Sequence, residues 1–77
     1  MSPRLPRITG HEAIKALRRG GWYVHYQRGS HTYLKHPDYP ERRVTVAVHG
    51  GDIIKPKTLQ SILKQAGLGV EELLELL

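Results

Sequence analysis

The stretch RGSHTYLKHP places a histidine, His31, directly after the Gly29-Ser30 pair and at the head of a run of alternating side chains. Basic residues, Arg28 and Lys35, lie on either side of it. An imidazole can accept and release protons near neutral pH, and cationic side chains can contact phosphates. This combination suits a nucleic acid ligand. The alternative is that His31 is a solvated residue of an exposed strand, where tyrosine and threonine are also common.

Further residues able to contact RNA lie on the segments around this histidine. Tyrosine rings can stack on unpaired bases, and arginine or lysine can contact the backbone phosphates. Two more histidines lie on the neighbouring segments. The candidate RNA-binding residues are Arg28, Tyr33, Lys35, Arg42 and Arg43, and the candidate secondary histidines are His25 and His49.

Five histidines in 77 residues also raise the question of a metal site. Zinc sites take three or four ligands from Cys, His, Asp and Glu. The chain has no cysteine, and His31 and His36 fall on opposite faces of a strand. No carboxylate is adjacent in sequence to His25, His31 or His49. We therefore predict no metal site and no cofactor.

The charge of the chain is basic and unevenly distributed. All twelve Lys and Arg lie within residues 1–67, whereas the last ten residues carry three glutamates and no base. A basic surface favours a polyanionic partner because binding releases counterions. The chain lacks cysteine, a secretory signal and any apolar run of the roughly 18 residues that span a membrane. These features predict a cytoplasmic protein with no membrane association.

The apolar spacing predicts one domain over residues 8–77, preceded by a flexible arm over residues 1–7. Thr9 and Glu12 form a capping-box pattern that begins a helix, and the Gly20-Gly21 pair ends it. A second helix is predicted over TLQSILKQAG. A short third helix is predicted over VEELLELL, whose leucines exceed the need of one buried face and can cover the domain or meet a partner.

Three strands are predicted between the first two helices, over WYVHYQ, SHTYLKHP and RVTVAVHG, with Gly29 at positive φ in the first turn and DYPER as a loop. The order α-β-β-β-α indicates an α+β fold, with a three-stranded antiparallel sheet, two helices on one face and a short C-terminal helix. We expect the uncovered face to present Tyr23, His25, Gln27, His31, Tyr33, Lys35 and His49. We expect the core to bury Trp22, Val24, Leu34, Val46, Leu59 and Ile62, with Tyr26 also facing inward.

Two segments carry a resemblance to a known family. GGWYVHYQRGSHTYLKHP and RVTVAVHGGDIIKPKTLQSILKQAGLGVEELLELL resemble the HicA-type toxins of bacterial and archaeal HicAB toxin-antitoxin systems. The resemblance covers nearly the whole chain from Gly10. The chain departs from the family pattern at Thr32, where a second histidine is common, at Ala47, where proline is common, and at Lys57, where glycine is common.

The resemblance implies a dsRBD-like fold and activity as an mRNA interferase, an endoribonuclease that is neutralised by a HicB-like antitoxin. The catalytic histidine of the family follows Gly-Ser, which here is His31, and its turn glycine is Gly29. As a general acid or base His31 needs no metal, while Arg28, Lys35 or the amide of Gly29 stabilises the phosphorane charge. His25 and His49 are the candidates for the second proton transfer.

Two other functions stay open from the sequence. A non-catalytic RNA-binding module of the same fold would use the same charges without cutting. An interaction protein would dock a partner through the C-terminal leucines. The Gly29-Ser30-His31 turn favours the nuclease over the binding module.

Overall fold

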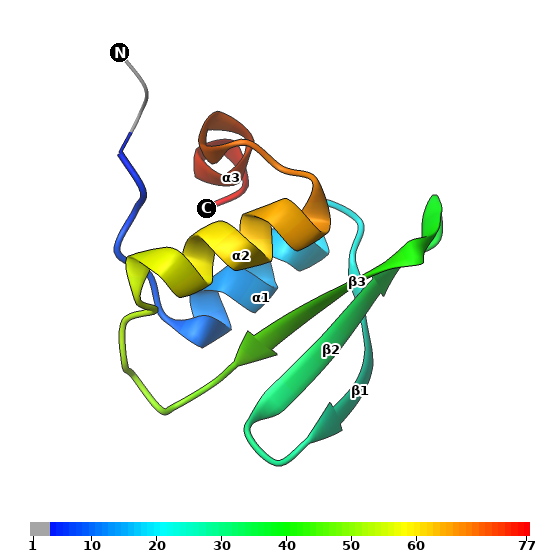
Figure 1. Cartoon of the computed structure of the whole chain (residues 1–77), viewed down its shortest axis with the longest axis horizontal. Coiled ribbons are helices and arrows are strands. Elements are labelled where there is room, and N and C mark those ends of the chain that lie inside the picture. Colours follow the sequence, from blue (N-terminus) through cyan, green and yellow to red (C-terminus); the bar gives the residue numbers. More distant parts are fainter. Residues whose placement is uncertain (1–3) are drawn as a thin grey trace.

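A computed structural model describes residues 4–77 and shows a three-stranded sheet with helices on one side of it (Figure 1). The elements in chain order are α1 (Gly10–Arg19), β1 (Tyr23–Arg28), β2 (His31–His36), β3 (Tyr39–Ala47), α2 (Pro56–Ala66) and α3 (Val70–Leu76). The sheet is antiparallel with the strand order β1-β2-β3. This architecture confirms the predicted α+β fold class and element order.

The start of α1 is fixed by the predicted capping box. The Thr9 hydroxyl accepts a hydrogen bond from the Glu12 amide at 3.2 Å, and the Glu12 carboxylate accepts one from the Thr9 amide at 2.9 Å. A Cβ on Gly10 would lie 2.8 Å from the Ala47 carbonyl oxygen. Glycine at this position therefore lets the start of α1 approach the end of β3, at the end of the sheet where β2 begins.

The core lies between the sheet and the helices. Five of the six side chains predicted to be buried are buried, and those are Trp22, Leu34, Val46, Leu59 and Ile62. The sixth prediction is wrong, because Val24 is 42% exposed. Val24 pairs with the buried Leu34, but β1 and β3 lie at opposite edges of the sheet. Helix α2 packs on β3, and all six residues of β1 are exposed.

An irregularity in β1 changes which side chains share a face. The pairing of β1 with β2 shifts between Val24 and Tyr26, at a bulge that includes His25. A bulge adds one residue to one strand and reverses the alternation beyond it. The prediction that Tyr26 faces the core is therefore wrong, since Tyr26 pairs with the outward-facing Tyr33. Gln27, predicted to face outward, pairs with the buried Thr32.

The third strand begins earlier than predicted. β3 starts at Tyr39, so the connection from β2 is only the turn Pro37-Asp38, and DYPER is not a loop. Pro40 is tolerated within β3 because this strand lies at the edge of the sheet, where an amide has no obligatory partner.

The two ends of the chain pack differently from each other. Of the predicted flexible arm, residues 1–3 lie outside the described residues, and Leu5 is half-buried against the core. At the other end, α3 buries Leu73 and leaves Leu74 exposed, and Leu77, which follows α3, is also exposed, each of the two at 42%. None of the helices in residues 4–77 has the length and apolar character needed to cross a membrane.

Candidate functional site

His31 lies at the first position of β2, directly after the turn that joins β1 to β2. The turn has two residues, and Gly29 has φ of 59° while Ser30 does not have a positive φ. This is the pattern of a tight hairpin turn that matches the twist of the strands. The turn confirms the prediction of positive φ at Gly29 and leaves the His31 side chain exposed.

The face of the sheet away from the helices carries the candidate residues. His31 pairs with Arg28 on β1 and with Ala47 on β3, so these three side chains share this face. The next outward positions of β2 are Tyr33 and Lys35, which confirms the predicted phase of this strand. We refer to this surface as the open sheet face, made up of Tyr23, Tyr26, Arg28, His31, Tyr33, Lys35, Arg43, Thr45 and Ala47.

An aromatic and cationic row crosses the open sheet face beside His31. The rings of Tyr26 and Tyr33 are stacked, with centroids 4.4 Å apart and an interplanar angle of 17°. The Arg43 guanidinium carbon lies 5.1 Å from the centroid of the Tyr33 ring. The His31 ring is 6.5 Å from the Tyr33 ring at 26°. We refer to Tyr26, Tyr33 and Arg43 as the tyrosine row.

Tyr26 is the member of the tyrosine row that sequence reasoning missed. Alternation counted forward from Trp22 places Tyr26 in the core. Alternation counted backward from the two-residue turn pairs Arg28 with His31 and then Tyr26 with Tyr33, as the structure has it. The two counts disagree by one residue, and that disagreement is the signal of a bulge that the sequence carries.

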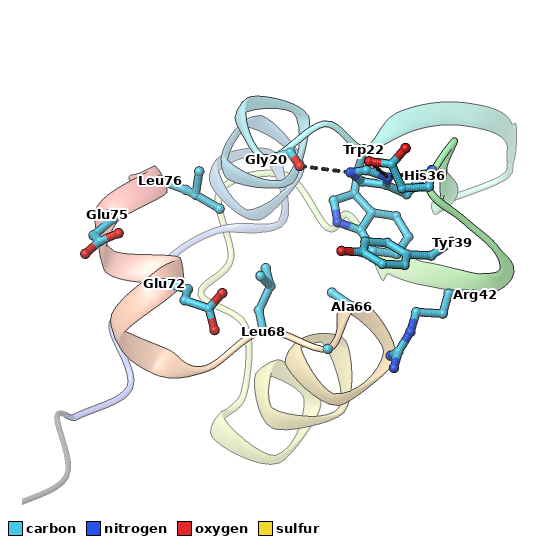
Figure 2. A pocket seen from close by; sticks show the side chains of 12 residues that line it. Gly20, Trp22, His36, Tyr39, Arg42, Ala66, Leu68, Glu72, Glu75 and Leu76 are labelled. Carbon is cyan, nitrogen blue, oxygen red and sulfur yellow. Dashed lines mark hydrogen bonds and ion pairs between the residues drawn. The ribbon is translucent and has the colours of Figure 1, made fainter.

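The predicted phosphate-binding residues do not all lie on one surface. Arg28, Lys35 and Arg43 lie on the open sheet face. Arg42 does not, because its guanidinium donates to the Gln65 carbonyl oxygen at 3.2 Å and lies against Gly67 at the end of α2. Figure 2 shows Arg42 beside a hollow that Trp22 and His36 also line, and His31 is not among its lining residues.

The two secondary histidines lie in different surroundings. His49 follows β3, and the ladder continues toward it because the Val48 amide donates to the Ser30 carbonyl oxygen at 2.7 Å. Next to it is a hollow of about 320 Å³, lined by Ala47, His49, Asp52, Ile53, Ile54, Lys55 and Thr58. His25 lies in the β1 bulge, with its ring 5.4 Å from the Tyr26 ring.

His36 has a structural role at the opposite end of β2. Its Nε2 lies 3.1 Å from the Gly20 carbonyl oxygen, and its Nδ1 accepts a hydrogen bond from the Asp38 amide at 3.1 Å (Figure 2). Nδ1 as acceptor leaves Nε2 as the donor to Gly20. The ring also meets the Trp22 ring edge to face at 5.3 Å.

Over residues 4–77, no three His, Asp or Glu side chains gather as a metal site requires.

Comparison with known proteins gives one informative match. A search of curated proteins finds no match. A family model described as "HicA toxin of bacterial toxin-antitoxin" matches residues 10–68, which is more than half of the chain. The matched segment includes α1, the whole sheet and α2, and therefore His31 and its turn, whereas α3 lies beyond it. The chain belongs to the HicA family of toxins from bacterial toxin-antitoxin systems.

Proposed function

We propose that this HicA-family toxin is an mRNA endoribonuclease in which His31 transfers a proton during cleavage. The observation that carries the proposal is the placement of His31, exposed at the head of β2, with Arg28 as its cross-strand partner. An imidazole beside a cationic side chain suits proton transfer at a phosphodiester. The family match spans this hairpin and supports the assignment.

The proposed reaction uses the RNA substrate's own nucleophile. His31 removes the proton of a ribose 2′-hydroxyl, whose oxygen forms a bond to the adjacent phosphorus while the bond from phosphorus to the 5′-oxygen breaks. The products are a 2′,3′-cyclic phosphate and a free 5′-hydroxyl. Arg28 and Lys35 offset the charge that gathers on the phosphorane oxygens. The proposal uses no metal and no cofactor.

A second group must protonate the departing 5′-oxygen. His49 is the first candidate, because the Val48–Ser30 hydrogen bond holds the chain just before it against the turn that precedes His31. Lys55 lines the same hollow as His49 and adds positive charge there. His25 is the second candidate, although its ring lies against Tyr26.

We further propose that a HicB-like antitoxin neutralises the toxin by covering the open sheet face. The family belongs to toxin-antitoxin systems, which supports a protein partner of this kind. Arg28 and Arg43 are exposed on this face, so an acidic partner surface would complement it. Occupying an exposed site is a direct way to block access of RNA to it.

A non-catalytic RNA-binding module is the second candidate function. The exposed tyrosine row and its cation favour it, since such a surface can bind single strands without cutting them. The two functions separate in one assay with a labelled single-stranded RNA. A nuclease yields fragments, whereas a binding module yields only a shifted band.

The deciding test compares His31→Ala with His11→Ala. His11 is an exposed histidine on α1, away from the open sheet face, and serves as the matched control. We expect His31→Ala to abolish RNA fragmentation and growth arrest, whereas His11→Ala retains both. Melting curves establish that both proteins are folded. Continued cutting by folded His31→Ala protein would end the assignment.

A further inference from the structure

We propose that Tyr26 is a stacking subsite for an unpaired RNA base next to the cleavage position. This inference rests on the proposed function, and it names the form of the substrate: RNA that is unpaired where it is cut. The subsite is the exposed end of the tyrosine row, in which Tyr33 and Arg43 hold Tyr26 in place.

The order of the strands makes Tyr26 the end of the row. Arg43 lies on β3, Tyr33 on β2 and Tyr26 on the edge strand β1. Tyr33 is half-buried between the guanidinium at 5.1 Å and the Tyr26 ring at 4.4 Å. Tyr26 is 43% exposed, no strand of residues 4–77 lies beyond it, and the His25 ring 5.4 Å away meets it at 73° without stacking on it. A planar ligand can therefore extend the row at Tyr26.

The row also fixes the orientation of the Tyr26 ring before any ligand binds. Stacking on Tyr33 at 17° restricts the ring, and the contact with Arg43 restricts Tyr33 in turn. Side chains that are already ordered lose less conformational entropy on binding. An exposed tyrosine without such a neighbour would have to be ordered by the base itself.

The position of Tyr26 relative to His31 connects the subsite to the cleavage chemistry. Arg28 pairs with His31, and Tyr26 pairs with Tyr33, so Tyr26 and His31 are diagonal neighbours across the hairpin. Diagonal neighbours in an antiparallel pair lie about 7–8 Å apart. A nucleotide whose base stacks on Tyr26 thus has its backbone within reach of the imidazole.

This placement selects unpaired RNA over a duplex. A base within an A-form helix is already stacked on both faces, so it cannot stack on a protein ring without leaving the helix. Stacking on an aromatic side chain accepts any of the four bases, because each has a flat face. We therefore expect a requirement for an unpaired base with weak preference for its identity.

The test measures RNA affinity with the His31→Ala protein, so that no cutting is needed. The probes are a labelled single strand, the same strand with one abasic nucleotide placed at each position in turn, and a duplex of the same sequence. We expect Tyr26→Ala to weaken binding of the single strand roughly 5- to 100-fold. Tyr26→Phe should retain the affinity, since the ring is what binds.

Tyr23→Ala is the matched control. Tyr23 is on the same strand, faces the same side and is 47% exposed, close to the 43% of Tyr26, but it pairs with Lys35 and not with an aromatic residue. We expect Tyr23→Ala to lower the affinity less than twofold. Equal losses for Tyr23→Ala and Tyr26→Ala would overturn the subsite, because they would indicate a general effect of surface tyrosines.

The abasic scan and the duplex comparison add two readouts on the protein that retains Tyr26, so the proposal stays testable if Tyr26→Ala does not fold. We expect one abasic position to weaken binding to the protein that retains Tyr26, and to have no added effect when Tyr26 is alanine. A flat scan, or a duplex bound as tightly as the single strand, would overturn the proposal. If Tyr26→Ala instead leaves RNA affinity intact and abolishes inhibition by the antitoxin, Tyr26 is a protein contact and the proposal fails.

The subsite and the nuclease fail separately. A wild-type protein that cuts RNA while Tyr26→Ala changes no affinity refutes the subsite alone. A wild-type protein that never cuts, yet shows the base-dependent loss at Tyr26, refutes the nuclease and supports the stacking subsite as part of an RNA-binding module.

Discussion

The imidazole of His36 occupies the space in which a side chain on Gly21 would lie. A Cβ on Gly21 would come within 2.6 Å of the His36 Nε2 atom, and Gly21 has φ of 98°. The same Nε2 lies 3.1 Å from the carbonyl oxygen of Gly20. The glycine pair thus lets the end of α1 pack against the end of β2, at the opposite end of the sheet from His31.

This relationship predicts that Gly21→Ala destabilises the fold by about 1–3 kcal/mol. The reasons are the positive φ and the displacement of the His36 ring. Gly51→Ala is the control, because a Cβ on Gly51 would have no neighbouring atom within 4 Å and its φ is not positive. Urea unfolding measures both variants. Equal stability of the two variants would show that the end of α1 adjusts freely.

The exposure of β1 predicts that truncating two paired apolar residues, one on β1 and one on β2, has unequal effects on stability. Leu34 is fully buried at 0% exposure, whereas its partner Val24 is 42% exposed. We expect Leu34→Ala to cost about 2–5 kcal/mol through the cavity that it leaves. We expect Val24→Ala to cost about 0.5 kcal/mol or less, as exposed positions usually do. Thermal melting of both variants tests the difference, and a similar loss for both would contradict it.

The sequence predicted most of the fold because its local signals agree with one another. The Thr9–Glu12 cap, the stripe of α2 and the alternation of β2 each specify an element by a short pattern that tertiary packing does not contradict. Two errors fall on β1, where the bulge at His25 reverses the alternation of side chains, and another falls at the start of β3, which begins at Tyr39 instead of after a loop. Periodicity also cannot show that a strand lies at an edge, so it assigned Val24 to the core.

The candidate site was predictable at the turn and less so around it. Gly29 and His31 are specified by a two-residue turn, whose geometry depends on local sequence alone. Strand alternation places Arg42 and Arg43 on opposite faces of β3. The hydrogen bond from Arg42 to the Gln65 carbonyl oxygen, by contrast, depends on where α2 ends. The register of the hairpin, which pairs Tyr26 with Tyr33, is what places Tyr26 on the open sheet face.

The positions of the arginines predict the salt dependence of RNA binding. In the His31→Ala background, we expect Arg28→Gln and Lys35→Gln each to reduce the slope of log affinity against log salt by about 0.7, because each removes one phosphate contact with a single strand. Arg42→Gln should leave the slope unchanged, since its guanidinium contacts the end of α2. Affinity titrations at several salt concentrations measure the slopes. A slope that changes equally for Arg42→Gln would place the RNA elsewhere.

The proposed chemistry predicts how cleavage responds to removal of metal ions. Proton transfer by His31 needs no metal, so we expect EDTA to leave the rate of RNA fragmentation unchanged. The 5′ fragments should end in a 2′,3′-cyclic phosphate or its hydrolysis product, which mass spectrometry identifies. A substrate with 2′-deoxyribose at the cleaved position should resist cutting. Loss of activity in EDTA that added Mg²⁺ restores would contradict the mechanism.

The proposed coverage of the open sheet face by the antitoxin predicts where hydrogen exchange slows on complex formation. Within residues 4–77, the outer edge of β1 has no neighbouring strand, so we expect its unpaired amides to exchange readily in the free toxin. We expect exchange to slow over residues 23–35, which include the Gly29-Ser30 turn, when the antitoxin binds.

The charge of the open sheet face predicts that Arg28→Glu weakens the complex, because it places a carboxylate against an acidic partner. Lys64→Glu on α2 is the matched charge reversal, and it should leave the complex intact. Slowing confined to residues 70–77 would instead place the antitoxin on α3 and its exposed leucines.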